Sequence, residues 1–511
     1  MEEIKYINKK NYLLYIILIT AIFLIVPHII RYVNYGELIL PGDKSYYHLS
    51  ISEQLLNKEL SVNEFFSQAE ASKTNFNDKL IIPFRPLIIT PYHLIIAAFG
   101  RYIPHISLAW VMLLLLIILG LASVFLFDRI LERFKVSYLQ RFIILLLLVL
   151  SPLFLQTFLM PDQIYFIIFL QLLGFYLYTS KATSLKYLPV KYLSLIPYVI
   201  ISVFGIFHTL IAVMFIFGYE LFVNKKYRQI IALSIIMIGI SLYFNLPIYY
   251  KYGFVKTSIL SGNILHSYVT DLGASEGFGI FAIILTILGL IKTWQEKYEK
   301  KYSWIYVSCL VLFVFSFVYH QYVSYLNFIV MILSAFGLIY LLEIKWELKI
   351  IKNFTFLIII LGILFSGVSF ISRVAEMPPT QEFIDAFEWI KSNKPVDSVI
   401  LSYPEYGHMI KYYTNLKVLI DSNQNLIEDY SYFEGVANTI FQSRSLKEVE
   451  ELLARFNINL IIITKEMKEG LVWDKPNQGL LFLFDNSDKF RRVYLNPYVE
   501  VWEFEADNKL E

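Results

Sequence analysis

The chain has 511 residues, of which 57% are hydrophobic and only 17% are charged, and its formal net charge at pH 7 is +2. Soluble domains are about a quarter charged and about half apolar, so this composition excludes an ordinary globular core for most of the chain. The small net charge argues against nucleic acid as a partner. The single cysteine, Cys309, excludes an intrachain disulfide and a cysteine-based metal site.

Eleven apolar segments are candidates for membrane spans, which need roughly 20 mostly apolar residues each. The first follows Lys9 and Lys10, as in a signal peptide, but no small-residue cleavage site follows it, so we expect an uncleaved anchor. The stretch 192–223 fits either two short tilted spans or one span with a re-entrant segment. The segments lie near 11–30, 106–127, 139–158, 162–179, 192–206, 207–223, 228–247, 277–292, 303–319, 324–343 and 353–371.

Lysines and arginines gather in every second loop between these segments. They precede the first span and cluster again near 129–141, 181–191, 225–228, 292–301 and 345–352, whereas the short loops on the other side hold almost none. The positive-inside rule therefore predicts a multi-pass protein of the cell membrane with a cytoplasmic N-terminus. With an odd number of spans, the C-terminal part lies outside.

The fold class predicted is a polytopic α-helical membrane protein with an extracytoplasmic α/β domain. Residues 1–371 form the transmembrane domain, which has a long outer first loop, 31–105. Residues 372–511 are as polar as a soluble domain and alternate helical and strand patterns. We expect helices near 380–392, 426–441 and 445–455, strands at 398–402, 417–421 and 458–464, and a β-rich segment at 494–504.

Charged side chains at the outer mouths of the spans are costly to place there, which makes them functional candidates. Asp43 follows Pro41-Gly42 after the first span, and Asp162 lies in a very short turn between two spans. Arg85 is the one charge in the otherwise apolar stretch 80–96. Two carboxylates at one membrane surface suit a shared divalent cation, Mg or Mn, or the activation of an acceptor, because hard cations prefer oxygen ligands and a carboxylate is a natural general base.

Each candidate also has a structural interpretation. Asp43 could close a turn after Pro-Gly, and Asp162 could cap the helix that follows it. For His208 and His320, hydrogen-bonded or interfacial positions are the simpler expectation, and Glu276 is placed to begin a helix.

The order of these motifs resembles the GT-C superfamily of membrane glycosyltransferases, which take sugars from polyprenyl-phosphate carriers. The stretch 42–49 (GDKSYYHL) looks like the element that opens the long outer loop of archaeal oligosaccharyltransferase catalytic subunits. Arg85-Pro86-Leu87, followed by Pro91-Tyr92, is similar to their Arg-Pro-Pro-Leu-Tyr-Pro stretch. Asp162 stands where the family keeps a second outer-loop acid, and 402–408 (SYPEYGH) stands where oligosaccharyltransferases carry Trp-Trp-Asp-Tyr-Gly.

The chain departs from the family pattern at three places. The 403–407 motif lacks the paired tryptophans and the Asp that read an acceptor peptide, which weakens the case for transfer to protein. Gln163 replaces a second acid after Asp162, which weakens the case for a metal. The tenth span has Tyr322, Ser324, Tyr325 and Asn327 but no arginine for the carrier phosphate, a role that Arg85 could take.

The resemblance implies a glycosyltransferase that moves a sugar from a polyprenyl (dolichyl)-phosphate carrier to a glycan, lipid or protein acceptor at the outer membrane face. Asp43 and Asp162 would be the catalytic acids and the tentative metal ligands. The substrate-binding residues would be Arg85, Tyr46, His48, Glu405, Tyr406 and His408. Oligosaccharyltransferase-like transfer to protein, a transporter or flippase, and a non-catalytic scaffold remain alternatives. A transporter would place polar groups near the membrane midplane, whereas these spans are apolar through their centres.

Overall fold

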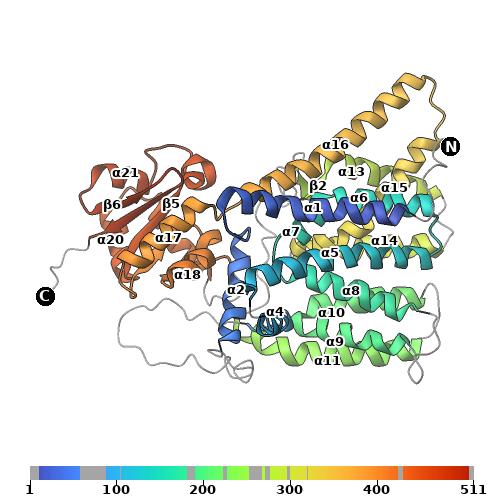
Figure 1. Cartoon of the computed structure of the whole chain (residues 1–511), viewed down its shortest axis with the longest axis horizontal. Helices are drawn as coiled ribbons and strands as arrows, with labels where there is room; N and C mark the ends of the chain where they lie inside the picture. Colours follow the sequence, from blue (N-terminus) through green and yellow to red (C-terminus); the bar gives the residue numbers. More distant parts are fainter. Residues whose placement is uncertain are drawn as a thin grey trace.

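The computed structural model of the chain is a bundle of long helices with a smaller region of strands and helices at one end (Figure 1). It describes residues 11–57, 88–103, 105–180, 190–221, 227–252, 268–270, 277–295, 300–318, 320–423 and 430–505. We call residues 381–504 the C-terminal region. The start of the first described helix, at Tyr12, lies at the opposite end of the bundle from this region.

Each of the eleven apolar segments is helical in the structure. Among the described residues, five runs are long and apolar enough to cross a membrane, and the pair α6 and α7 would make a sixth. The other five segments are shorter apolar helices, so the number of crossings stays a prediction. The helices are α1 (Tyr12–Tyr35), α5 (Leu108–Arg133), α6 (Tyr138–Leu150), α7 (Pro152–Leu159), α8 (Ile164–Tyr178), α9 (Leu195–Phe204), α10 (Ile206–Tyr219), α11 (Tyr227–Tyr252), α13 (Ile280–Gln295), α14 (Lys300–Val318), α15 (Val323–Glu343) and α16 (Lys349–Glu376).

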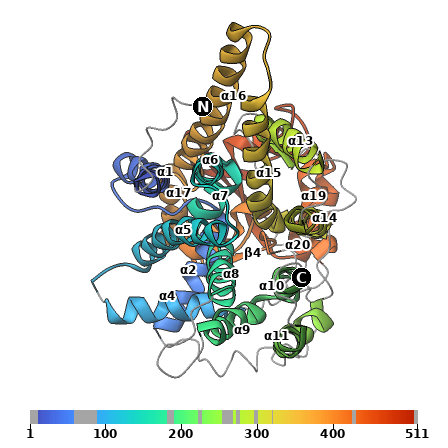
Figure 2. The same cartoon turned by 90° about the vertical axis from the view of Figure 1, so that its right-hand side faces the viewer.

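The broken span α6–α7 lies inside the bundle, between α1 on one side and α13 and α15 on the other (Figure 2). Its two halves are bent by 62° at Ser151, which is extended because Pro152 disfavours helical backbone in the residue before it. The hydroxyl of Ser151 donates a hydrogen bond to Asn327 Oδ1 at 2.9 Å. The Ser151 hydroxyl at the bend therefore has its hydrogen-bond partner on α15.

The stretch 192–223 forms two short helices, α9 and α10, that meet at Gly205. Lys191, just before α9, pairs with Glu220, just after α10, at 2.9 Å. Because the start of α9 lies beside the end of α10, the two helices run antiparallel. Tyr178 at the end of α8 donates a further hydrogen bond to the buried Glu220 carboxylate at 2.6 Å.

Helices α13 and α15 pack with their backbones almost touching. A Cβ atom added to Gly289 would lie 1.9 Å from the Leu333 carbonyl oxygen, and one added to Gly337 would lie 1.9 Å from the Leu285 oxygen. Thr286 and Ser334 share a hydrogen bond of 2.8 Å across the same contact. Small residues at such contacts let helices associate in a membrane, where apolar burial between helices gains little over lipid.

The C-terminal region contains a five-stranded sheet in the order β4-β3-β5-β7-β6. The strands are β3 (Val399–Leu401), β4 (Lys417–Val418), β5 (Ile458–Thr464), β6 (Phe490–Leu495) and β7 (Val499–Phe504). Strand β3 is parallel to β4 and β5, whereas β7 is antiparallel to β5 and β6. The helices of this region are α17 (Gln381–Asn393), α18 (Gly407–Thr414), α19 (Tyr430–Gln442), α20 (Leu446–Arg455) and α21 (Leu480–Asn486).

The predicted β-rich segment 494–504 is not continuous. It contains the end of β6, a turn and the whole of β7. The turn forms at Asn496-Pro497, where Asn496 exchanges hydrogen bonds with Val499. Asn and Pro are turn residues, and together they reverse the chain into a hairpin.

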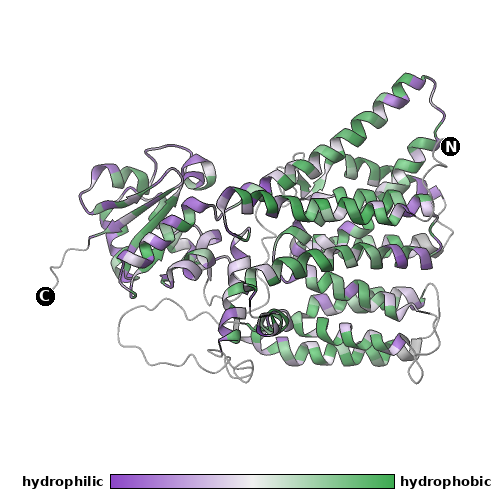
Figure 3. Cartoon of the chain, viewed as in Figure 1, coloured by the Kyte–Doolittle hydropathy of each residue, from purple (hydrophilic) through white to green (hydrophobic). Residues whose placement is uncertain are grey.

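Two helices of the long first loop place this region against the bundle. Helix α2 (Asp43–Leu56) runs across the direction of the bundle helices and contacts α4, α5 and α18 (Figure 1). Helix α4 (Pro91–Tyr102) lies beside it. The bundle helices are predominantly hydrophobic, whereas hydrophilic residues gather in the C-terminal region and at the N-terminal end of the bundle (Figure 3).

Arg31, near the end of α1, fastens the first helix of the bundle to the last. Its guanidinium is fully buried and donates to the carbonyl oxygens of five residues. Four of these acceptors belong to the end of α16 and the residues after it. The five acceptors are Ile39, Val374, Ala375, Met377 and Pro379, at 2.5–3.3 Å. A buried cation is tolerated here because carbonyl dipoles replace its hydration.

Candidate active site

Asp43 is the first residue of α2 and is turned toward the C-terminal region. Its carboxylate accepts hydrogen bonds from the Met409 backbone N–H at 2.9 Å and from the Ser422 hydroxyl at 2.7 Å, and only 7% of the residue is exposed. Met409 is the third residue of α18, one of the helix positions whose N–H has no partner within the helix. Asp43 therefore caps a helix that belongs to a different part of the chain.

Gly407 allows this contact because it lets the start of α18 approach Ile420 and Asp421 closely. A Cβ atom at Gly407 would lie 2.5 Å from the Asp421 Cβ atom and 2.8 Å from the Ile420 carbonyl oxygen. Real side chains do not approach so closely. The absence of a side chain at residue 407 is thus a condition for placing Met409 and Ser422 on the same carboxylate.

The environment of Asp43 favours the neutral acid. Burial raises the pKa of Asp43 well above its ordinary value, and the nearby Asp421 carboxylate raises it further. The hydrogen bonds from Ser422 and Met409 act in the opposite direction, because they stabilise the charged form. An acid with a raised pKa holds a proton firmly, which suits a group that accepts one during a reaction.

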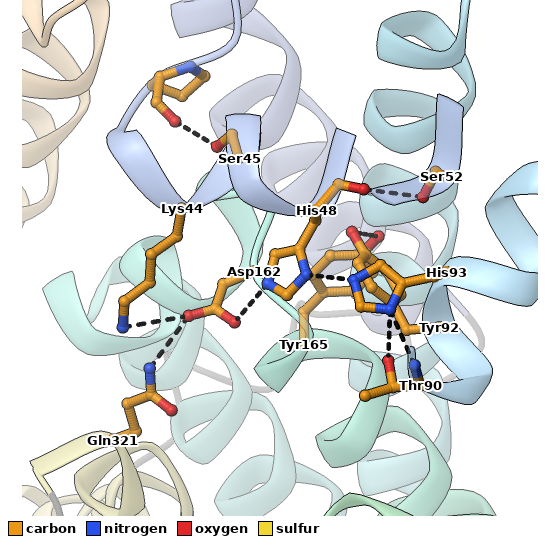
Figure 4. A network of polar contacts seen from close by, with 11 residues as sticks. Lys44, Ser45, His48, Ser52, Thr90, Tyr92, His93, Asp162, Tyr165 and Gln321 are labelled. Carbon is orange, nitrogen blue, oxygen red and sulfur yellow. Dashed lines mark hydrogen bonds and ion pairs between the residues drawn. The ribbon is translucent and has the colours of Figure 1, made fainter. Parts of the chain in front are cut away.

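Asp162 lies in the turn between α7 and α8 and is held by three side chains (Figure 4). His48 Nε2 is 3.3 Å from its Oδ1 atom, and Gln321 donates to its Oδ2 atom at 3.0 Å. The Lys44 ammonium is 3.7 Å from the same Oδ2 atom. Burial alone would raise the pKa of Asp162, but Lys44 and His48 together outweigh it and lower that pKa well below the ordinary value.

Helix α2 thus carries one predicted acid and binds the other. Asp43 faces α18, whereas Lys44 and His48 of the same helix hold Asp162. Successive residues of a helix point about 100° apart, so Asp43 and Lys44 serve different sides of α2. One acid is biased toward its neutral form and the other toward its charged form, so the two carboxyl groups are suited to different roles.

In the part of the chain that the structure describes, the groups facing these two acids are hydrogen-bond donors and an ammonium. Asp162 faces the Lys44 ammonium, and Asp43 faces the N–H and O–H donors of Met409 and Ser422. Among the residues that the structure describes, no group of three or more His, Cys, Asp or Glu side chains comes together in a way that would hold a metal ion. The predicted shared divalent cation stays a prediction, and the proposed chemistry below uses no step through it.

The other predicted site residues are less closely gathered. The ring centroids of His408 and Tyr47 are 5.0 Å apart and the rings are tilted by 49°, and His408 Nε2 lies 3.7 Å from Asp421 Oδ1. Tyr46 is buried and accepts a hydrogen bond from Tyr413 of α18. Tyr406 donates instead to Glu466, away from Asp43, and Glu405 is exposed at the surface. Arg85 and Glu276 lie outside the described residues.

No family model and no curated protein matches the sequence. Solved structures do match. One is the archaeal oligosaccharyltransferase AglB from Archaeoglobus fulgidus, in complex with an inhibitory peptide and a dolichol-phosphate. The superposition covers 90% of this chain and 70% of the AglB chain, with a TM-score of 0.59 and 12% sequence identity. Another is ArnT from Cupriavidus metallidurans bound to undecaprenyl phosphate. Here the superposition covers 96% of this chain and 98% of the ArnT chain, with a TM-score of 0.51 and 9% sequence identity.

A third similar structure is the arabinofuranosyltransferase AftD from mycobacteria. The superposition covers 96% of this chain and 40% of the AftD chain, with a TM-score of 0.50 and 12% sequence identity. All three are GT-C glycosyltransferases. The chain has the GT-C fold. Identities this low establish the fold alone, so the activity has to be argued from the site.

Within this GT-C fold, the polar residues of the tenth predicted span are used for helix packing. Ser324 accepts a hydrogen bond from Thr157 of α7 at 3.0 Å. Tyr325 and His208 of α10 are joined at 2.9 Å, as the hydrogen-bonded interpretation of His208 predicts. With Asn327 bound to Ser151, these side chains connect α15 to its neighbours.

Sequence reasoning missed four residues of this candidate site, Lys44, His93, Gln321 and Ser422. His93 had a local signal, because Thr90-Pro91-Tyr92-His93 has the spacing of a capping box with His in place of Glu or Gln. Gln321 and Ser422 had none, since each reaches its acid across more than a hundred residues of sequence.

Proposed function

We propose that the chain is a membrane glycosyltransferase that moves a sugar from a polyprenyl (dolichyl)-phosphate carrier to an acceptor at the outer membrane face. One observation carries the proposal. Of the two acids predicted from sequence, Asp43 begins helix α2 and Asp162 is bound by Lys44 and His48 of the same helix, and their surroundings bias their protonation in opposite directions. The likeness to AglB and ArnT, solved with dolichol-phosphate and with undecaprenyl phosphate, supports a lipid-linked donor.

The reaction proposed is a displacement at the anomeric carbon of the sugar. The acceptor's nucleophilic atom forms a bond to that carbon while the bond from the carbon to the phosphate oxygen breaks. Asp43 takes up the acceptor's proton, and the carrier leaves as a phosphate anion. A positioned carboxylate and a cation for the leaving phosphate are sufficient equipment, because the phosphate is already a stable anion.

Two cations are assigned to the carrier phosphate. Arg85 has this role from the sequence pattern, and the structure adds Lys44, whose side chain is 40% exposed beside Asp162. Asp162 would then hold the Lys44 ammonium toward the phosphate. Tyr46, His48 and the segment Glu405 to His408 would shape the acceptor side of the site.

The proposed sidedness places the N-terminus in the cytoplasm and the site outside. The start of α1 and the C-terminal region lie at opposite ends of the bundle, which supports an odd number of crossings (Figure 1). The loops rich in Lys and Arg support this orientation.

Two rival functions make different predictions. A transporter or flippase would need substrate-binding polar groups at the membrane midplane, whereas the ionisable cluster described here gathers at the end next to the C-terminal region. Transfer to protein would need a peptide-reading motif, and Tyr406 is turned toward Glu466 rather than toward Asp43. A lipid or glycan acceptor is therefore favoured over a peptide.

The test is sugar transfer by the purified full-length protein in liposomes supplied with polyprenyl-phosphate sugars. Mass spectrometry of the co-purified lipid should first identify the carrier. Asp43→Asn should lower the rate at least about 100-fold, the contribution of a general base. Asp385→Asn, at an exposed position of α17, is the matched control and should behave as wild type.

Full activity in Asp43→Asn would overturn the mechanism. Transport of the lipid without sugar transfer would favour a flippase. Treatment with a chelator tests the metal separately, since a lost rate that Mg²⁺ or Mn²⁺ restores would establish the predicted cation.

A further inference from the structure

Asp162, two histidines and one backbone amide form a continuous chain of hydrogen bonds (Figure 4). Asp162 Oδ1 is 3.3 Å from His48 Nε2, and His48 Nδ1 is 2.8 Å from His93 Nε2. The chain of hydrogen bonds ends at His93 Nδ1, which accepts a hydrogen bond from the Thr90 backbone N–H at 2.9 Å and lies 3.0 Å from the Thr90 hydroxyl, which can also donate to it. His48 and His93 are both buried, with 4% and 0% of each residue exposed.

The last link fixes the direction of every other link. A backbone N–H only donates, so His93 Nδ1 has to be the acceptor and carries no proton. In a neutral imidazole one nitrogen donates and the other accepts, so His93 Nε2 carries the proton and donates to His48 Nδ1. By the same argument, the His48 proton is on Nε2 and is donated to Asp162.

The local sequence holds this arrangement rigidly. Thr90 is the N-cap of α4, Pro91 is the first helical residue, and His93 occupies the position at which a capping box has Glu or Gln. The ring of Tyr92 stands edge-on to His48, and the Tyr92 hydroxyl accepts a hydrogen bond from Tyr165 at 3.0 Å. The titratable groups that face His48 are Tyr47 on its own helix, Tyr92 and His93 on α4, and Asp162.

We propose that His93 is a positioning residue which, through His48, fixes Asp162 as a hydrogen-bond acceptor oriented toward Lys44 and Gln321. We call this chain of hydrogen bonds, from Asp162 through His48 and His93 to Thr90, the relay. Reversing its direction would bring an N–H of His93 against the N–H of Thr90. Asp162 therefore cannot pass a proton along the relay. Asp43 is then the acid that takes up the acceptor's proton. This last step rests on the proposed function, whereas the protonation pattern of the histidines does not.

The protonation pattern is tested directly by ¹⁵N NMR of the full-length protein in lipid, labelled at its eight histidines. The spectra of His48→Gln and His93→Gln assign the two residues by the signals that disappear. Both should show a protonated Nε2 and an unprotonated Nδ1. A protonated Nδ1 on either residue in the wild-type protein would overturn the inference.

The role of the relay is tested by two substitutions at one position. His93→Gln keeps an N–H for His48 and an oxygen for Thr90, whereas His93→Leu removes both. The kcat of sugar transfer should fall about 10- to 100-fold in His93→Leu, as for other residues that orient a functional group, while the KM for acceptor changes little. His93→Gln should recover most of that loss. His105→Leu, at an exposed position shortly after α4, controls for the substitution itself.

Wild-type kcat in His93→Leu, or equal losses in the two folded His93 variants, would remove the positioning role. If the wild-type protein transfers no sugar while the NMR pattern holds, the proposed function fails and the relay stands. If transfer is present and the NMR pattern is reversed, the relay fails and the proposed function stands.

Discussion

Asp43 and Met409 are 366 residues apart in the sequence, yet the carboxylate of one accepts the backbone N–H of the other at 2.9 Å. This contact joins α2, the helix that follows the first helix of the bundle, to the C-terminal region. Each oxygen of a carboxylate has a second lone pair, so an acceptor hydroxyl can approach Asp43 while Met409 and Ser422 stay bound. The C-terminal region therefore takes part in the site.

The hydrogen bond from Ser422 predicts a shift in the pH dependence of transfer. This bond stabilises the charged form of Asp43 and so lowers its pKa, against the raising effect of burial. Ser422→Ala should therefore raise the pKa of Asp43. Because Asp43 has to be ionised to accept a proton, the acid limb of the rate profile should move to higher pH. Transfer rates measured across pH test this, with Ser443→Ala, at a half-buried serine that binds Glu448 instead, as control. An unmoved limb, or one moved to lower pH, would contradict the assignment of Asp43 as base.

Replacing Gly407 with alanine should weaken the packing of α18 against α2. Gly407→Ala places a methyl group against Asp421, so α18 has to move and Asp43 loses the Met409 N–H. Overpacking of this kind costs about 1–3 kcal/mol. Hydrogen exchange of the amides of α18 should accelerate, and transfer should decline with it. Gly435→Ala is the matched control, because an added Cβ meets nothing within 4 Å there and alanine favours the helix. Unchanged exchange in Gly407→Ala would show that the close approach is not required.

The contact between α13 and α15 predicts a purely structural effect. Gly289→Ala would force the two backbones apart and should destabilise the bundle by about 1–3 kcal/mol. The midpoint of thermal unfolding in detergent should fall accordingly. Gly239→Ala in α11, where an added Cβ meets nothing within 4 Å, should leave the midpoint unchanged or slightly higher. Equal midpoints for the two variants would argue against close packing at Gly289.

Much of the fold follows from local patterns in the sequence. The apolar runs predicted every helix of the bundle, because a long uncharged stretch has few other stable conformations in a membrane. Asp43, Asp162 and the long outer loop were also predicted, since charges at the mouths of spans are rare. Contacts over hundreds of residues leave no such pattern. The placement of Met409 on Asp43, and of Gln321 on Asp162, depends on which surfaces pack together and needed the structure.

The Arg31 contacts bear on how the protein is made. A chain emerges from the ribosome N-terminus first, so α1 enters the membrane while residues 374–379 are not yet synthesised. Until then the Arg31 guanidinium lacks four of the five carbonyl partners that surround it in the finished fold. Its neighbour α2 likewise lacks Met409 and Ser422. The candidate site is consequently completed only when the last helix of the bundle and the C-terminal region have been synthesised, and a truncated chain would insert without assembling it.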